Sequence, residues 1–379
     1  MKKQAHFSTR MLLGLIMAVL LGAVPKISLA EEPTFSRLAD ASAYVRRCAE
    51  KRQSEFFFYL TDPQVVSWDA DAFLDEFVEC TGLIVRLSIN CQEAGPGKLR
   101  IGLRPTYRPG VRMADAWKSG DTGGLNSDEK SALEHAERVA RSIRSQYASA
   151  LDRELAVHDY LCKILTYEEA DDSEKLPPQR LATYALNTGK ANCQGYSDAF
   201  YLLGTLAGLN VRIQDGDNLA GGHTWNAVEL DGNWYMLDVT ANDTDGDSLA
   251  PEAPGYIFFN MGRDLLAANG YTWKETREAA DIAEYTDGNY FFYHGGVGQY
   301  GAAFGKIKDL TQYCYDLKKN VGINDCWTML VNGASGFDVD DFHNSMKKVT
   351  DHHGSATRWT FWYWQAGGQL YIYHRWIQF

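Results

Sequence analysis

Apolar residues recur at helical spacing through the first half of the central part of the chain. Behind Asn126 or Ser127 as a cap, and with Glu129 in the first turn, residues 126–147 carry apolar side chains every three or four positions. More helical segments lie on either side of the break at Pro177–Pro178. These segments cover residues 151–167, 181–187 and 193–207. The pattern predicts four successive helices.

Segments of strand character come next, at residues 211–214, 223–230 and 234–240. Between the last two, Asp231 and Gly232 predict a two-residue turn that pairs Leu230 with Asn233. Because helices precede strands in this region, the order indicates an α+β domain rather than a doubly wound α/β sheet.

Two shorter regions flank the central one and share an order of helix, strand, helix and two strands. The first runs through residues 36–52, 55–60, 68–80, 83–90 and 98–105, and the second through residues 308–320, 325–331, 336–349, 358–364 and 369–376. Aligning Trp68 with Phe337 also places Asp69 over Asp338, a good helix cap in each copy. We therefore predict two related small α/β modules, and the sequence leaves open whether they arose by duplication.

The first 30 residues have a basic start, an apolar run of about 14 residues and small residues at Ser28 and Ala30. This pattern predicts a signal peptide, and the competing interpretation, a membrane anchor, needs an apolar run of about 20 residues. We expect a secreted or periplasmic protein with no membrane insertion after cleavage. The predicted division is a signal peptide 1–30, a module 31–118, a central domain 119–290, a glycine-rich linker 291–306 and a second module 307–379.

The formal net charge is −12, and removing residues 1–30 deletes four positive charges, which leaves about −16. A chain this acidic should not bind nucleic acid or anionic lipid. Charge argues only against these two partners and leaves the oligomeric state open. The substrate that we expect is a protein or peptide, with cell-wall material as one candidate, and that expectation does not come from the charge.

Seven cysteines occur, at positions 48, 80, 91, 162, 193, 314 and 326. Export permits disulfides, and an odd count leaves one thiol over even if the other six pair. The pairing cannot be deduced, and some cysteines can equally be buried thiols. Parity suggests one unpaired thiol with a role of its own.

Cys193 stands at the start of a predicted helix, after a glycine turn at Gly189. Unpaired backbone N–H groups at a helix start stabilise a thiolate, and the N–H of Cys193 can itself donate to a developing oxyanion. Gly195 leaves room for a substrate carbonyl to approach. Cys193 is therefore a candidate nucleophile.

His223 is the candidate base, because it follows a glycine-rich loop at the mouth of a strand. The two-residue turn places His223 opposite Thr240 and makes Asp238 its diagonal neighbour on the same face. Asp238 can then orient the imidazole, which completes a catalytic triad. Each residue also has a simpler interpretation: Cys193 as a packed thiol, His223 as a polar strand end and Asp238 as a cap.

Four segments resemble the bacterial transglutaminase-like superfamily, whose core is a papain-like cysteine fold. They are LAVHDYLCKILTY, ATYALNTGKANCQGYSDAFYLLGTLAGLNV, GGHTWNAVELDGNWYMLDVT and YIFFNMGRDLL, within roughly residues 150–275. The resemblance implies that Cys193 is the nucleophile, His223 the base and Asp238 the orienting residue. Ala241, where the family usually has an aromatic residue, departs from the pattern.

The same resemblance implies acyl transfer at an amide through a Cys193 thioester, without a cofactor. Water as acceptor gives a peptidase or amidase, which we favour, and a lysine amine gives a cross-linking transglutaminase. A third alternative is a non-catalytic scaffold that binds cell-wall glycan or protein. This last alternative is suggested by the aromatic strand 358–364, although we expect both faces of that strand to be buried.

Two further motifs give only weak indications of a binding site. The glycine-rich GGVGQYG near residue 296 lacks the strand and acidic residue of a nucleotide site. The acidic run from Asp243 to Asp247 has a misplaced glycine, and Pro254 stands where a calcium loop needs its last ligand. We predict no metal site.

Overall fold

The computed structural model describes most of the chain beyond residue 31. The described residues are 32–61, 77, 81–171, 173–243, 256–272, 287, 290, 301–305, 309, 312, 325–330, 337–352, 357–366 and 369–378. The predicted signal peptide, most of the predicted glycine-rich linker and most of the acidic run lie outside them. Among the described residues, no helix is both long and apolar enough to cross a membrane.

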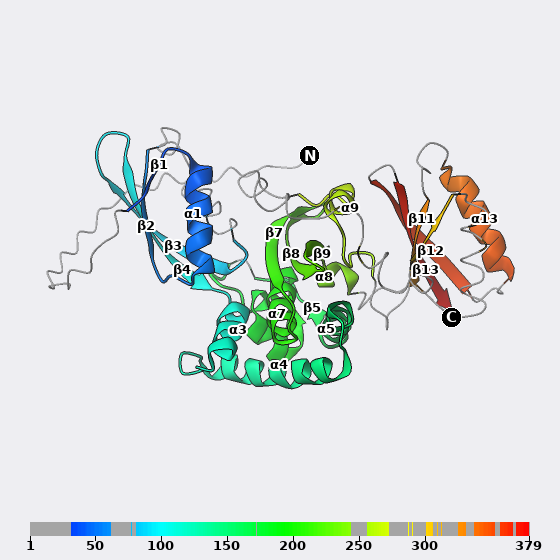
Figure 1. Ribbon diagram of the computed structural model, residues 1–379, viewed down its shortest axis with the longest axis horizontal. Coiled ribbons are helices and arrows are strands. Elements are labelled where there is room, and N and C mark those ends of the chain that lie inside the picture. The colour runs from blue at the N-terminus through cyan, green and yellow to red at the C-terminus, as the bar shows by residue number, and fades with distance from the viewer. Residues whose placement is uncertain are drawn as a thin grey trace.

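The N-terminal module is a four-stranded sheet with a helix on one face (Figure 1). Its elements are β1 (Thr34–Phe35), α1 (Leu38–Glu50), β2 (Phe56–Leu60), β3 (Ile84–Glu93) and β4 (Leu99–Tyr107), in the sheet order β1-β2-β4-β3. In β2, Phe56, Phe58 and Leu60 are buried while the residues between them are partly exposed. This alternation follows from the two faces of a strand, and it places the module's own core under α1.

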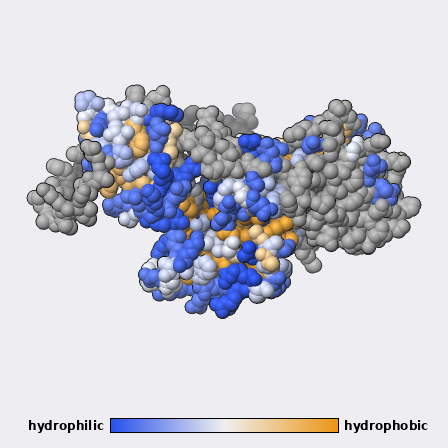
Figure 2. Space-filling view, in the orientation of Figure 1, coloured by the Kyte–Doolittle hydropathy of each residue, from blue (hydrophilic) through white to orange (hydrophobic). Residues whose placement is uncertain are grey.

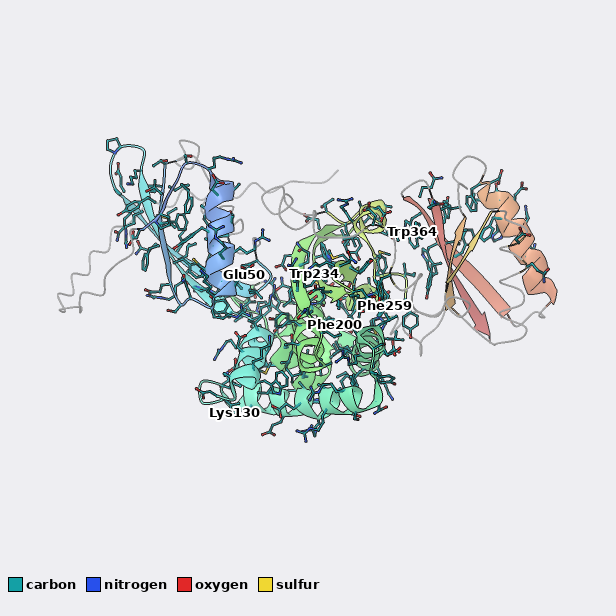
Figure 3. The ribbon with its side chains drawn as sticks, in the orientation of Figure 1. Glu50, Lys130, Phe200, Trp234, Phe259 and Trp364 are labelled. Carbon is teal, nitrogen blue, oxygen red and sulfur yellow. The ribbon has the colours of Figure 1, made fainter. Side chains whose placement is uncertain are left out.

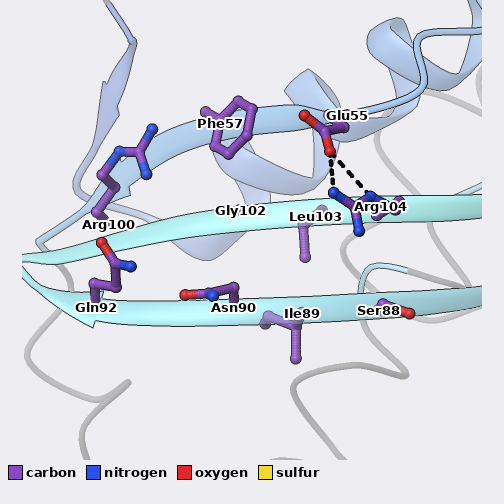
Figure 4. A pocket seen from close by; sticks show the side chains of 10 residues that line it. All are labelled: Glu55, Phe57, Ser88, Ile89, Asn90, Gln92, Arg100, Gly102, Leu103 and Arg104. Atoms are coloured by element: carbon purple, nitrogen blue, oxygen red, sulfur yellow. Dashed lines mark hydrogen bonds and ion pairs between the residues drawn. The ribbon is translucent and has the colours of Figure 1, made fainter. Parts of the chain in front are cut away.

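A hollow of about 330 Å³ lies on the sheet of this module (Figure 4). Arg100, beside Phe57, is bound to Glu32 at 2.8 Å, and Arg104 is bound to Glu55 at 2.9 Å. Since both guanidinium groups already pair with carboxylates inside the module, the hollow offers no unbalanced charge. It shares no lining residue with the site around Cys193.

The central region surrounds one long buried helix, α7 (Cys193–Leu206), in which every residue from Gly195 to Leu206 is buried. Phe200 of this helix lies in the middle of the region, whereas Lys130 lies on its outer rim (Figure 3). The helices and short elements around it are α3 (Pro109–Ser119), α4 (Ser127–Gln146), α5 (Ala150–Ile164), β5 (Thr166–Tyr167), η2 (Pro178–Arg180), α6 (Ala182–Thr188) and β6 (Lys190–Ala191). The four predicted helices are confirmed, except that the second ends at Ile164, three residues earlier than predicted, and is followed by β5. The Asn126 side chain caps α4, and the Glu129 side chain accepts the N–H of Asn126 in return.

The other side of α7 packs on the antiparallel sheet β7-β8-β9, made of β7 (Val211–Asn218), β8 (Gly221–Leu230) and β9 (Asn233–Leu237). Two short helices follow, α8 (Val239–Asn242) and α9 (Arg263–Ala268). The outer face over α4 is mostly hydrophilic, while apolar residues gather nearer the middle of the region (Figure 2). Helices packed on an antiparallel sheet confirm the predicted α+β class.

The predicted turn between β8 and β9 is confirmed, because Leu230 pairs with Asn233 and both Asp231 (φ 51°) and Gly232 (φ 80°) have positive φ. The predicted pairing of His223 with Thr240 is wrong. β9 ends at Leu237, and the chain then turns into α8. Asp238 caps that helix instead of continuing the strand.

The C-terminal module repeats the topology of the first. Its elements are β10 (Gly301–Phe304), β11 (Asp325–Leu330), α13 (Val339–His352), β12 (Thr357–Ala366) and β13 (Gln369–Gln378), in the sheet order β10-β11-β13-β12. In both sheets the first two strands are parallel and the other pairs are antiparallel. The exact domain boundaries stay predictions.

The aromatic strand β12 is less buried than we expected. Trp362 is 37% exposed and Tyr363 is 44% exposed, so the prediction that both faces are covered is wrong for these two residues. Trp364, in contrast, packs against the core of the central region, as do Tyr371 and Tyr373 of β13. The module therefore meets the central region through one part of its sheet.

Candidate active site

Cys193 is the first residue of α7, and Asn192 is the cap of that helix. The Asn192 side chain accepts hydrogen bonds from the N–H groups of Gln194 (3.1 Å) and Gly195 (3.3 Å). No hydrogen bond within the described residues engages the N–H of Cys193, which is one of the unpaired donors of a helix start. The partly exposed thiol therefore lies beside an available donor and the positive end of a helix dipole.

The first turn of α7 packs tightly against the preceding loop, and this contact requires glycine at position 195. A Cβ atom on Gly195 would lie 2.2 Å from the carbonyl oxygen of Gln179. That same carbonyl accepts the N–H of Asn192 at 3.0 Å. The predicted room for a substrate at Gly195 is thus taken by the chain itself, and the glycine serves to fix the helix start.

His223 on β8 lies between Cys193 and Asp238. Its Nε2 is 2.6 Å from Oδ2 of Asp238, and the His223 and Asp238 side chains are only 12% and 2% exposed. The His223 side chain also makes a hydrogen bond with Cys193. Because Asp238 occupies Nε2, Nδ1 is the nitrogen left for the thiol. The structure thus brings the three predicted residues together in the predicted order.

The charges of this trio support one another. Burial alone would lower the pKa of His223, but the charge and hydrogen bond of Asp238, helped by Cys193, outweigh burial and raise that pKa to about 10. Burial would raise the pKa of Asp238, yet His223 and other hydrogen bonds lower it. A protonated imidazole beside an ionised carboxylate is therefore the stable arrangement.

Two tyrosines that sequence reasoning missed also belong to this site. Tyr271 donates its hydroxyl to Oδ2 of Asp238 at 2.6 Å, and its ring packs edge-on against Trp225. Tyr167 on β5 is 47% exposed, and the partial burial of its phenol raises its pKa to about 12, with a smaller contribution from the nearby Cys193. Neither tyrosine lies in a local pattern with Cys193, His223 or Asp238, so only the folded chain brings them there.

A second group of the same residue types lies on α5, and we call it the α5 cluster: Cys162, His158, Asp159 and Tyr256. Cys162 Sγ is 3.8 Å from Nε2 of His158, and Nδ1 of His158 is 2.8 Å from Oδ1 of Asp159. Tyr256 donates its hydroxyl to the same Oδ1 at 3.0 Å. Cys162 and His158 are buried, at 6% and 0% exposure.

The suggestion that six cysteines pair and leave one over does not hold, because four cysteines are free. None of Cys48, Cys91, Cys162 and Cys193 forms a disulfide. Cys48 packs in the core of the N-terminal module, Cys91 is exposed on β3, and Cys162 lies on the buried face of α5. Cys80 and Cys314 lie outside the described residues, as does the side chain of Cys326. Parity therefore does not single out Cys193; its place at the start of α7 does.

Within the described ranges, no three His, Cys, Asp or Glu side chains are placed to hold a metal ion. The acidic run is described only as far as Asp243, which accepts the hydroxyl of Tyr196. Of the glycine-rich motif, only Gly301 at its end is described.

Residues 137–239 match the model of the transglutaminase-like superfamily. Human kyphoscoliosis peptidase is 32% identical over 128 residues, which are 31% of this chain and 19% of that protein. This chain thus spans less than a fifth of that relative.

Solved structures with partial likeness include a crystal structure of a TGase, at 15% identity and a TM-score of 0.28, covering 55% of this chain and 59% of that one. Another is a putative cysteine protease from Cytophaga hutchinsonii, at 12% identity and a TM-score of 0.25, covering 41% of this chain and 65% of that one. The matched segment 137–239 holds Cys193, His223 and Asp238. The central region of this chain is a transglutaminase-like domain.

Proposed function

We propose that the protein is an exported cysteine hydrolase that cleaves amide bonds in proteins or peptides through a thioester on Cys193. One observation carries the proposal: the 2.6 Å contact between His223 Nε2 and Asp238 Oδ2, made by a ring that also bonds Cys193 at the start of α7. A base held by a buried carboxylate beside a helix-start thiol is the arrangement that acyl transfer needs.

In the first half of the reaction, the Cys193 thiolate attacks the amide carbonyl carbon and a C–S bond forms. The carbonyl oxygen gains the negative charge and accepts a hydrogen bond from the N–H of Cys193. As the C–N bond breaks, the imidazolium of His223 gives its proton to the leaving nitrogen. Asp238 stays ionised throughout and stabilises the imidazolium.

In the second half, His223 takes a proton from water, whose oxygen attacks the thioester carbonyl. The C–S bond then breaks, the acid product leaves, and the thiolate–imidazolium pair is restored. With an amine in place of water, the same steps would join two chains. The partial identity to a relative named a peptidase supports water as the acceptor.

Export is part of the proposal and is supported by the composition of residues 1–30. An extracellular or periplasmic location would keep the enzyme with protein and peptide substrates outside the cytoplasm.

The test compares the protein with its Cys193→Ala variant on casein in the presence of dansylcadaverine. New amino termini or released ammonia report hydrolysis, and fluorescence bound to casein reports amine transfer. We expect hydrolysis to exceed amine transfer, and both to vanish in Cys193→Ala. Hydrolysis that persists in the variant would contradict the proposal. Amine transfer that exceeds hydrolysis would assign the cross-linking reaction instead.

A further inference from the structure

Tyr271 and His223 both bond the same carboxylate oxygen. The hydroxyl of Tyr271 and Nε2 of His223 each lie 2.6 Å from Oδ2 of Asp238. The other oxygen, Oδ1, accepts the N–H of Ala241 at 3.0 Å because Asp238 caps α8. With Oδ1 committed to the helix, Tyr271 and His223 must share Oδ2.

The backbone around Tyr271 is built to hold it in this position. Thr272 pairs with Asp217 at the end of β7, through hydrogen bonds of 2.8 and 3.0 Å. A Cβ atom on Gly216 would lie 2.2 Å from the carbonyl oxygen of Thr272, so the segment reaches β7 only because position 216 is glycine. Gly270, at φ +77°, makes the preceding turn.

Toward Asp238 the phenol acts as a donor. Burial and the charge of Asp238 both raise the pKa of Tyr271 far above its ordinary value, so the hydroxyl keeps its proton. The ring is 4% exposed and packs edge-on against Trp225, with ring centroids 5.1 Å apart. Phenylalanine could supply that packing, but it would leave Oδ2 with His223 alone.

We propose that Tyr271 is a positioning residue of the Cys193 site, whose hydroxyl holds Oδ2 of Asp238 toward His223 and limits how strongly that oxygen binds the imidazolium. The inference rests on the proposed function. A carboxylate oxygen that accepts a strong O–H donor has less negative charge to offer a second donor. Tyr271 therefore acts through Asp238 on the proton of His223.

The test follows alkylation of Cys193 by iodoacetamide from pH 4 to about 11.5, a range that spans the raised pKa of His223 and the expected shift. Its rate should rise in two steps, first when the thiolate–imidazolium pair forms and again when His223 loses its proton and frees the thiolate. In Tyr271→Phe the second step should move up by about one pH unit, because a hydrogen bond to a charged group is worth roughly that much. Tyr160→Phe is the matched control, since it removes a 2.6 Å hydroxyl contact with His135 on other elements.

Fluorotyrosine in place of Tyr271 keeps the size of the ring and makes the hydroxyl a stronger donor. It should move the second step down, opposite to Tyr271→Phe, and it decides the question if the phenylalanine variant is unstable. A second step that stays in place in both variants would overturn the inference while the two-step profile of the parent protein still supports the proposed function. A parent protein without selective Cys193 labelling would overturn both.

Discussion

The Cys193 site and the α5 cluster contain the same residue types, and the same contacts join histidine, aspartate and tyrosine in each. Both have a histidine bound to an aspartate that also accepts a tyrosine hydroxyl, and a cysteine near the same histidine. Their settings differ. Cys193 begins a helix and is partly exposed, whereas Cys162 lies within a helix at 6% exposure. Placement, rather than composition, therefore separates the partly exposed thiol at a helix start from the packed one.

The exposure of the two carboxylates differs in the opposite direction to that of the two thiols. Asp238 is 2% exposed, and its hold on His223 acts in a low-dielectric setting. The Asp159 side chain is 41% exposed, so water screens its attraction for His158. Cys162 also donates its thiol to the carbonyl oxygen of Val239 at 3.9 Å. The comparison supports the chemistry proposed for the first group and a packing role for the second.

The largest expected difference comes from removing each histidine. His223→Ala should slow alkylation of Cys193 at pH 6 by about 100-fold, because the thiolate loses its imidazolium partner. His158→Ala should leave that rate unchanged and lower the melting temperature, since it empties a fully buried site. Rates from iodoacetamide mass mapping and melting curves measure both effects. Equal losses of rate in the two variants would remove the distinction between the groups.

Replacing each aspartate should give a smaller difference of the same kind. Asp238→Asn cannot stabilise the imidazolium by charge and should slow Cys193 labelling at pH 6 by about tenfold or more. Asp159→Asn should have no effect on labelling, because its carboxylate faces water and a different histidine. Iodoacetamide mass mapping of both variants measures these labelling rates. An Asp159→Asn variant as slow as Asp238→Asn would show that the α5 cluster takes part in the chemistry.

The buried face of α5 should instead affect how the stability of the protein depends on pH, through Glu154. Burial raises the pKa of Glu154 to about 8, against the opposing effect of a 2.8 Å hydrogen bond from Asn260. In the described part of the chain, Glu154 Oε2 and Asn260 Oδ1 have no hydrogen-bond partner. A proton on Oε2 would serve both oxygens. The titratable groups nearby are His158, four residues along the same helix, and Tyr290, whose pKa Glu154 helps to raise.

The direction of this pH dependence follows from the raised pKa of Glu154. The proton of Glu154 stabilises the fold fully below about pH 4.5, the value of an ordinary glutamate here, and this contribution is lost as the pH rises toward 8. Glu154→Gln mimics the protonated acid, so its unfolding free energy should match the parent at pH 4.5 and exceed it at pH 8 by about 1 to 3 kcal/mol. Urea unfolding at both pH values measures this. A variant less stable at pH 8 than the parent would contradict a protonated Glu154.

Removing the N-terminal caps of α7 and α5 should give the smallest difference between the two groups. Asn192→Ala at α7 and Ser149→Ala at α5 each remove a capping oxygen, and each should cost about 1 kcal/mol of stability. Only Asn192→Ala should also slow the labelling of Cys193, by a few fold, because it loosens the helix start that holds the thiol. Unfolding and labelling of the two variants check this. Equal labelling of both would limit the cap to a structural role.

The residues of the trio were predictable because each lies in a local pattern: Cys193 at a helix start, and His223 and Asp238 on either side of an Asp-Gly turn. The predicted strand pairing beyond Leu237 failed because Asp238 caps a helix, a competition that local alternation does not reveal. Tyr271 lies 33 residues after Asp238, and the pairing of its neighbour Thr272 with β7 that brings it there is tertiary.

The α5 cluster shows that a suggestive group of residues in the sequence does not by itself identify a site. His158, Asp159 and Cys162 stand within five residues of one another and are the same residue types as Cys193, His223 and Asp238. What excludes them is burial, which depends on the packing of α5 against α4, α7 and α8. The cysteine count misled for a related reason, since a thiol such as Cys48 is stabilised by the core of its module and needs no partner.

The most direct test of the account labels the native protein with limiting iodoacetamide from pH 5 to 9 and maps every modified cysteine. At pH 6 an ordinary thiol, with a pKa of about 8.5, is almost wholly protonated. The account predicts that Cys193 is labelled at pH 6, that the exposed Cys91 reacts only at higher pH, and that the buried Cys48 and Cys162 stay unmodified. Labelling of Cys193 no faster than that of Cys91 at pH 6 would contradict an activated nucleophile.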